Sequence, residues 1–240
     1  MSTKTTKYGL HIDYVPIVQA MFNKTVAYDA CIKLYADELG DVPYKTLQPI
    51  VERTNMNEML EKWIFQKSCK KAKQMIMEHE KFDYISVNIS VNYLKNENYI
   101  SNLLEIFEKS EIPSEKICIE IAESGMKTEA DSVINKLHEL KREGFMIAID
   151  DYNTVYIPLS RLDSVPADII KLDKNITNKV QIDKNAEQTV KSIVQRAKQI
   201  GCEVIAKSVE DQKHKYLLIA LGCDKIQGAI AETPVETKVV

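Results

Sequence analysis

The sequence places polar and charged side chains directly after short apolar stretches that are typical of buried β-strands. IDD (149–151) and IIKLD (169–173) are two examples. In an α/β barrel the C-terminal ends of parallel strands meet at one rim, and the chemistry of such folds lies there. The residues expected at this rim are Asp29, Asn88, Glu120, Glu123, Asp150, Asp151, Lys171, Asp173, Lys207, Glu210 and Gln227.

A set of carboxylate and amide oxygens of this kind suits a hard divalent cation such as Mg²⁺ or Mn²⁺. Such an ion activates water and neutralises phosphate charge, as hydrolysis of a phosphodiester requires. A single acid at a strand end is more often a helix N-cap or a solvated loop residue. Six polar strand ends on one rim are harder to explain in that way. The adjacent carboxylates of Asp150 and Asp151 repel each other unless a metal ion or a lysine lies between them.

The elements that must position these residues alternate between helix and strand. Apolar residues recur at helical spacing over 133–140, 190–200 and 216–221, and each stretch is followed by a glycine and a short apolar strand. A glycine just past the last apolar helical residue is a typical helix stop. Continuous apolar strands that alternate with helices predict a parallel sheet covered by helices.

The number of predicted strands favours a closed (β/α) barrel over an open sheet. An early strand near 13–18 and a second around 26–34 precede six strands of the repeated kind. These six cover 84–90, 117–124, 145–151, 167–173, 202–210 and 223–228. The apolar stripe over 59–77 predicts a covering helix, whose Met and Trp residues are interpreted as core. A chain of 240 residues without a Gly/Ser-rich or Pro-rich stretch is expected to form a single domain over 1–240.

Composition argues against several classes of protein. The net charge of −3 does not favour binding to a nucleic acid polymer. The N-terminal residues lack the apolar run of a signal peptide, and no stretch approaches the length of a membrane span, so a cytoplasmic protein without membrane contact is expected. The five cysteines have no CxxC spacing and are interpreted as reduced thiols, which also argues against a zinc site.

Several motifs in a fixed order resemble the EAL family, the cyclic-di-GMP phosphodiesterase domains of bacterial signalling. The resemblance runs from about Tyr14 to Pro234 and implies a modified TIM-like (β/α)8 barrel whose first strand is antiparallel. The motifs are YVPIV (14–18), YDACIK (28–33), SVNIS (86–90), IEIAES (119–124), IDDYNT (149–154), IIKLD (169–173), VIAKSVE (204–210) and GCDKIQG (222–228).

The resemblance implies roles for individual residues. The metal ligands would be Asp29, Asn88, Glu120 and Asp150. The catalytic positions would be Lys171, Lys207 and Asp151, with Glu123 as an acid that positions a loop. The ligand-binding positions would be Lys33, Asp173, Glu210 and Gln227. The cofactor of the family is Mg²⁺ or Mn²⁺, and the alternative for this chain is that it needs none.

Several departures from the family pattern fall at the implied site. Lys207 stands where the family has a Glu that is implied to hold the metal-bound water, so the charge is reversed. Asp29 is one methylene shorter than the Glu that names the family, and Lys33 lacks the bidentate fork of the Arg it replaces. Other departures are Val15 for a Gln that resembles a guanine contact, Asn153 for a Gly, and Ala229 and Ala231 for larger residues.

Two interpretations of Lys207 remain open at the level of sequence. In the first, its ammonium group projects into a cluster with Glu120, Asp150 and Asp29 and takes the place of the divalent ion in a buried ion-pair network. In the second, Lys207 extends to solvent and a metal ion still binds nearby. The strand-end geometry favours the first interpretation.

Three functions are compatible with these residues. The first is a degenerate, catalytically impaired regulatory module that binds cyclic-di-GMP, weakened by Val15 and Lys33, or a protein partner. The second is an active metal-dependent phosphodiesterase that yields the linear dinucleotide. The third is an unrelated barrel enzyme with Lys171 or Lys207 as a Schiff-base amine, which leaves the ordered EAL motifs unexplained. The resemblance also makes a homodimer plausible, through a helix beside the rim.

Overall fold

The computed structural model describes residues 8–37, 40–43, 46, 51, 53, 54, 56–127, 130–231 and 235–236. Its strands are β1 (Tyr8–Gln19), β2 (Lys24–Ala36), β3 (Gly40–Pro43), β4 (Ile85–Asn88), β5 (Ile117–Ala122), β6 (Met146–Tyr152), β7 (Ile169–Leu172), β8 (Glu203–Ala206), β9 (Lys225–Ile226) and β10 (Val235–Glu236). Its helices are α2 (Asn57–Met77), α3 (Val91–Leu94), α4 (Glu97–Glu108), α5 (Ala130–Arg142), α6 (Lys174–Thr177), α7 (Lys184–Gln199) and α8 (Gln212–Ala220), with 3-10 turns η1 (Ser114–Lys116), η2 (Glu123–Met126) and η3 (Leu159–Ser164).

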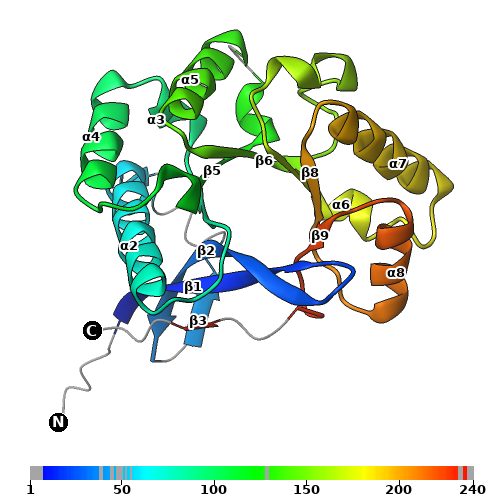
Figure 1. Ribbon diagram of the computed structural model, residues 1–240, viewed down its shortest axis with the longest axis horizontal. Coiled ribbons are helices and arrows are strands. Elements are labelled where there is room, and N and C mark those ends of the chain that lie inside the picture. Colours follow the sequence, from blue (N-terminus) through cyan, green and yellow to red (C-terminus); the bar gives the residue numbers. More distant parts are fainter. Residues whose placement is uncertain are drawn as a thin grey trace.

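Eight of these strands close into a barrel. The order around the ring is β1, β9, β8, β7, β6, β5, β4 and β2, and β2 returns to β1. β1 is antiparallel to both of its neighbours in the ring, whereas the pairs from β2 through β4 to β9 are parallel. Figure 1 shows the strands around the centre with α2, α4, α5, α7 and α8 outside them. The predicted modified (β/α)8 barrel with an antiparallel first strand is confirmed.

Beyond the ring, the hairpin formed by β1 and β2 carries two short additional strands. β3 pairs with the end of β2, from Lys33 opposite Pro43 to Ala36 opposite Gly40. β10 pairs with β1 at Asp13 and Tyr14. The first half of β1 and the last half of β2 therefore form a sheet that extends past the barrel on the side where β2 ends.

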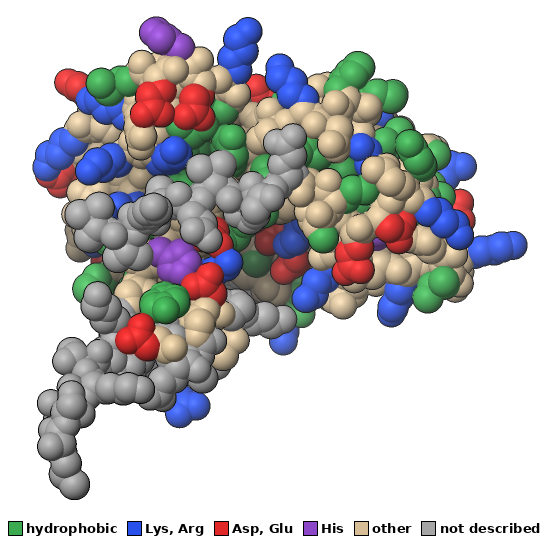
Figure 2. Space-filling model, turned by 90° about the horizontal axis from the view of Figure 1, so that it is seen from below, with side chains coloured by type: hydrophobic (Ala, Val, Ile, Leu, Met, Phe, Trp, Pro, Cys, Tyr) green, Lys and Arg blue, Asp and Glu red, His purple; other side chains and the backbone are tan. Residues whose placement is uncertain are grey.

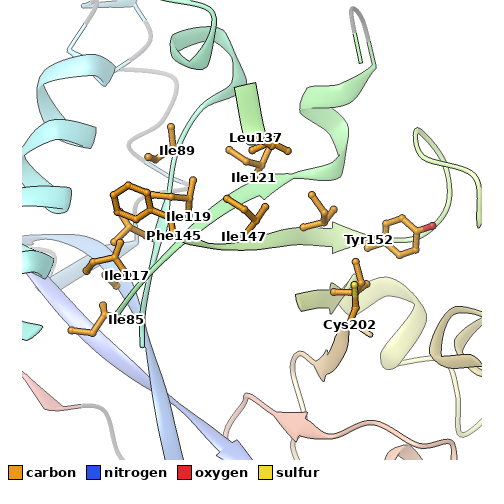
Figure 3. Close-up of a cluster of buried hydrophobic side chains, with 14 of the residues drawn as sticks. Ile85, Ile89, Ile117, Ile119, Ile121, Leu137, Phe145, Ile147, Tyr152 and Cys202 are labelled. Atoms are coloured by element: carbon orange, nitrogen blue, oxygen red, sulfur yellow. The ribbon is translucent and has the colours of Figure 1, made fainter. Parts of the chain in front are cut away.

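Side-chain alternation along the strands separates two apolar layers. In β5, Ile117, Ile119 and Ile121 belong to the layer between strands and helices, whereas Cys118 belongs to the cluster inside the barrel. Figure 3 shows part of the outer layer, with Phe145 beside the isoleucines of β5. Successive side chains of a strand point to opposite faces, so Glu120 must follow Cys118 on the inner face. The alternation thus directs the polar strand ends towards the barrel axis.

The predicted helix stops are also confirmed. Gly144, Gly201 and Gly222 follow α5, α7 and α8 and have φ values of +90°, +80° and +97°. Such values are easily adopted only by glycine. Among the described residues, no helix combines the length and the apolar character needed to cross a bilayer.

Gly228, at the end of β9, provides a test of how closely the strand ends pack. A Cβ atom there would lie 2.3 Å from the backbone nitrogen of Val209 and 2.5 Å from its oxygen. We expect Gly228→Ala to lower the free energy of unfolding by about 3 kcal/mol or more, because backbone atoms cannot rotate away. Urea unfolding followed by circular dichroism would measure the change.

The matched control is Gly201→Ala. Gly201 also has a positive φ, but a Cβ atom there would have no neighbour within 4 Å. Only the strain of the left-handed conformation remains, about 1–2 kcal/mol. Equal losses for the two variants would contradict the close approach of the two strand ends.

Candidate functional site

Residues of β2, β4, β5, β6 and β7 that point into the barrel form a polar cluster above its apolar interior. Lys171 lies at its centre and is fully buried. Its Nζ atom donates hydrogen bonds to Asp29 Oδ2 at 2.8 Å and to Glu120 Oε2 at 2.6 Å. Gln227 Nε2 donates to the same oxygen of Asp29 at 3.0 Å. The ammonium group of β7 thus links β2 and β5, and Gln227 after β9 joins this network through Asp29.

Burial and charge act in opposite directions on this group. Burial alone would lower the pKa of Lys171, but the carboxylates of Asp29, Glu120 and Asp150 raise it well above its ordinary value. Burial, together with the charge of Asp29, raises the pKa of Glu120, and this effect exceeds the opposing effect of Lys171. Lys171 therefore stays protonated, and the cluster holds more acidic groups than one ammonium can neutralise.

Lys207 neutralises the other pair of carboxylates. Its Nζ atom lies 2.5 Å from Asp150 Oδ1 and 2.6 Å from Asp151 Oδ1. Burial would raise the pKa of Asp150, but Lys171 and Lys207 together lower it. Asp151 and Ser208, which flank this contact, have positive φ values of 49° and 58°. Such strain in residues other than glycine is concentrated at functional sites.

One sequence-based expectation needs correction. Lys207 contacts Asp150 as expected, but its other partner is Asp151 rather than Glu120 or Asp29. The site between Asp29 and Glu120 is filled by Lys171, which extends from β7 across the barrel interior. The two lysines therefore divide the carboxylates between them, one pair each.

The residues implied to bind Mg²⁺ or Mn²⁺ do not fit a metal centre in this arrangement. Each of the two ammonium groups lies between a pair of carboxylates that would have to turn towards an ion. The amide nitrogen of Asn88 faces Glu120 Oε1 at 3.5 Å. Within the described part of the chain, no three His, Cys, Asp or Glu side chains are placed to hold one ion. We therefore derive no chemical step through a metal.

Glu123 lies outside the cluster and anchors the loop after β6. Its carboxylate accepts backbone hydrogen bonds from Asn153, Tyr156 and Ile157, each at 2.9 Å. Glu123 is 1% exposed, so these bonds replace water as its partners. The acid therefore positions residues 153–157 next to the rim and does not contact the lysines.

The remaining predicted positions have different surroundings. Asp173 caps α6 through the backbone nitrogen of Asn175 at 2.6 Å and accepts from Asn153 Nδ2 at 3.1 Å. Glu210 is exposed on the loop after β8. Lys33 is paired with Asp13 of β1. The structure thus brings Asp29, Asn88, Glu120, Asp150, Asp151, Lys171, Lys207 and Gln227 together and leaves Lys33, Glu123, Asp173 and Glu210 outside.

A cavity of about 670 Å³ opens beside the cluster, between β2, α2, β4, η2 and β6. Its lining includes Asn88, Asp150 and Asp151 from the rim and Glu61 from α2. In the face shown in Figure 2, acidic and basic side chains lie around a hollow. A volume of this size is ordinary for a small-molecule site.

Glu61 is a lining residue that the sequence-based reasoning missed. Its Oε2 atom accepts hydrogen bonds from the backbone nitrogen of Ser90 at 3.1 Å and from the hydroxyl of Tyr99 at 2.9 Å. Burial raises the pKa of Glu61 to about 7. Its position beside the buried Leu60 and Ile64 was the available signal, because an acid next to an apolar stripe is partly desolvated.

Comparison with known proteins identifies relatives over nearly the whole chain. The model of the EAL domain family matches residues 3–234. The cyclic di-GMP phosphodiesterase PA2567 of Pseudomonas aeruginosa is 23% identical over 95% of this chain and 39% of that protein. This chain spans 28% to 39% of the length of three such curated relatives.

Solved structures share the fold. The c-di-GMP complex of the PaMucR phosphodiesterase has a TM-score of 0.88 at 23% identity, covering 94% of this chain and 91% of that chain. EAL enzyme Bd1971, bound to cAMP and cyclic-di-GMP, has a TM-score of 0.86 at 25% identity, covering 94% of this chain and 62% of that chain.

The different burial of the two lysines predicts different effects on stability. Lys171→Met would leave the buried carboxylates of Asp29 and Glu120 without a cation, and we expect a loss of about 3–5 kcal/mol. Lys207→Met should cost about 1–2 kcal/mol, because water can solvate Asp151, which is 53% exposed, and the buried Asp150 keeps the positive charge of Lys171 nearby. Urea unfolding of both variants tests this order, and a larger loss for Lys207→Met would contradict it.

Glu61 predicts a dependence of stability on pH. The unfolded chain ionises Glu61 near its ordinary pKa of 4.5, whereas the folded chain does so near 7. Between these values the folded state binds more protons, so its stability falls as the pH rises from about 4.5 to about 7. We expect about 1–2 kcal/mol from this group, because Glu61 is partly exposed.

Glu61→Gln is the matched variant, because Gln keeps an oxygen for Tyr99 and Ser90 but has no charge. The difference in unfolding free energy between the natural protein and this variant should change between pH 5 and pH 8, in favour of the variant at pH 8. A constant difference would show that Glu61 ionises normally in the folded protein.

Proposed function

Because the chain belongs to the EAL domain family, we propose that it is a regulatory member that binds cyclic-di-GMP without hydrolysing it. The observation that carries this proposal is the ammonium group of Lys207 between Asp150 and Asp151. Lys207 occupies the position at which the resemblance to the EAL family implies a glutamate that assists the deprotonation of water. An ammonium group donates hydrogen bonds and cannot accept a proton from water, so it cannot act as that base.

The balance of charge at the rim also supports the proposal that the chain does not catalyse hydrolysis. Hydrolysis of a phosphodiester at neutral pH needs a strong local positive charge to activate water and to stabilise the transition state. Lys171 and Lys207 each carry one positive charge, and each is already neutralised by two carboxylates. Little positive charge remains for a developing oxyanion.

Binding of the nucleotide is supported by the cavity and by the relatives. The cavity lies directly beside the cluster and has the size of a ligand site. The Bd1971 structure, at 25% identity, is a form bound to cAMP and cyclic-di-GMP. Polar side chains that line the cavity, such as Asn88 and Asn92, offer hydrogen bonds to a base or a ribose.

The first test is a titration with cyclic-di-GMP, with and without Mn²⁺, followed by chromatography of the nucleotide after incubation. We expect the same affinity in both conditions and no linear dinucleotide, with the phosphodiesterase PA2567 as a positive control of the assay. Linear product would restore the active phosphodiesterase. Absence of both binding and turnover would make the rim a surface for a protein partner.

A second test restores an acid at position 207. Lys207→Glu removes the ammonium group and adds a carboxylate beside Asp150 and Asp151, so we expect it to create affinity for Mn²⁺ that calorimetry can detect. Lys207→Gln is the control, because it removes the ammonium group without adding a ligand of full charge. Unchanged metal binding in Lys207→Glu would contradict the replacement of a cation by Lys207.

A further inference from the structure

The cavity beside the rim is lined by more acidic than basic residues. Among the lining residues that the structure describes, Lys33 is the one lysine or arginine, whereas Glu61, Asp150 and Asp151 are carboxylic acids. A phosphodiester is negatively charged, so Lys33 is the lining residue best suited to attract it. The contacts of Lys33 therefore decide how this cavity treats an anionic ligand.

Lys33 is held by an acid of the same hairpin. β1 and β2 pair with His11 opposite Lys33 and Asp13 opposite Cys31, so these four side chains share one face. Lys33 Nζ makes a close ion pair with Asp13 Oδ2. The other oxygen of Asp13 lies 3.5 Å from His11 Nε2 and makes no hydrogen bond.

A second acid lies near Lys33 but is more weakly placed. Asp41 of β3 has one oxygen 3.8 Å from Lys33 Nζ and the other 3.6 Å from His11 Nε2. The side chain of Asp41 is 41% exposed, whereas that of Asp13 is 4% exposed. Water therefore screens Asp41, and the hydrogen bond to Asp13 is the main reason that the pKa of Lys33 is raised.

The burial of Asp13 fixes this partnership. A buried carboxylate that loses its cation is strongly destabilised, because neither water nor another full positive charge replaces the lost contact. The side chain of Lys33 is 31% exposed and lines the cavity, but Asp13 already neutralises its charge. A ligand phosphate must therefore compete with an internal carboxylate for the same ammonium group.

We propose that Asp13 determines the affinity of this cavity for phosphodiesters by occupying Lys33. The inference rests on the proposed binding of cyclic-di-GMP and adds a residue that tunes it. With Asp13 in place, the cavity offers an anion no unpaired ammonium group from its described lining. The chain would accordingly bind the nucleotide weakly, and a change at one buried acid would convert it into a tighter receptor.

The test is Asp13→Asn, which keeps the shape of the side chain and removes its charge. Isothermal titration with cyclic-di-GMP should show about tenfold tighter binding than the natural protein, which corresponds to about 1.4 kcal/mol. The gain should shrink as NaCl rises from about 0.05 M to about 0.5 M, because it comes from a charge that is partly exposed.

Two further variants separate this effect from a purely structural role of the ion pair. Asp41→Asn also removes an acid near Lys33 and should change the affinity less than twofold, because Asp41 is screened. The double variant Asp13→Asn/Lys33→Met has no ammonium group to release and should lose the gain. Melting temperatures of all variants establish that each is folded.

The possible results distinguish failure of this inference from failure of the proposed function. If the natural protein binds cyclic-di-GMP and Asp13→Asn binds no more tightly, the inference is wrong and the proposed function stands. If the double variant keeps the gain, the release of Lys33 is not its cause and the inference is also wrong. If none of the folded variants binds the nucleotide, both fail. Tighter binding by Asp13→Asn alone supports both.

Discussion

The structure depends on the neutralisation of several carboxylates that lie close together in a space with little water. Asp29, Glu120 and Asp150 lie on β2, β5 and β6, and less than a tenth of each residue is exposed. Their charges repel one another, and burial strengthens the repulsion because the local dielectric constant is low. Closure of the barrel therefore requires positive charge inside the rim. In this chain the positive charge is part of the polypeptide, from Lys171 on β7 and Lys207 after β8.

A fixed ammonium group has consequences that a diffusible ion would not have. It carries one positive charge, it cannot coordinate water as a metal ion does, and its position is fixed by the backbone to which it is attached. The backbone at this place is constrained: Asp151, Thr154 and Ser208 all have positive φ values. The anchoring of residues 153–157 by Glu123 and the close approach of Gly228 to Val209 hold these strained segments in position. The rim is thus a rigid assembly of ion pairs and tight backbone contacts.

The barrel and the composition of the rim could be predicted because both follow from local patterns. Apolar strands, helix stops at glycine and a polar residue at each strand end are visible in the sequence and need no knowledge of distance. The pairing of lysines with acids could not be predicted in the same way. Lys171 lies on β7 and Lys207 directly follows the neighbouring β8. Only the direction of each side chain decides that Lys171 crosses the interior to Asp29 while Lys207 turns to Asp151. Asp13 and Glu61 were missed for a related reason, because their surroundings come from elements distant in the sequence.

The same arrangement of charge occurs three times, twice in the polar cluster at the rim and once at Lys33 in the lining of the cavity. Lys171, Lys207 and Lys33 each make a close contact with a carboxylate that is largely buried, namely Glu120, Asp150 and Asp13. A phosphate that enters the cavity meets Lys33, the one lysine or arginine of its described lining, which is already paired with Asp13. Its binding energy is therefore the difference between the new contact with Lys33 and the weakened contact with Asp13. An affinity set by such a difference is sensitive to single charges. The proposed role, binding of an anion without hydrolysis, agrees with this arrangement, because catalysis requires positive charge that is free to meet the transition state.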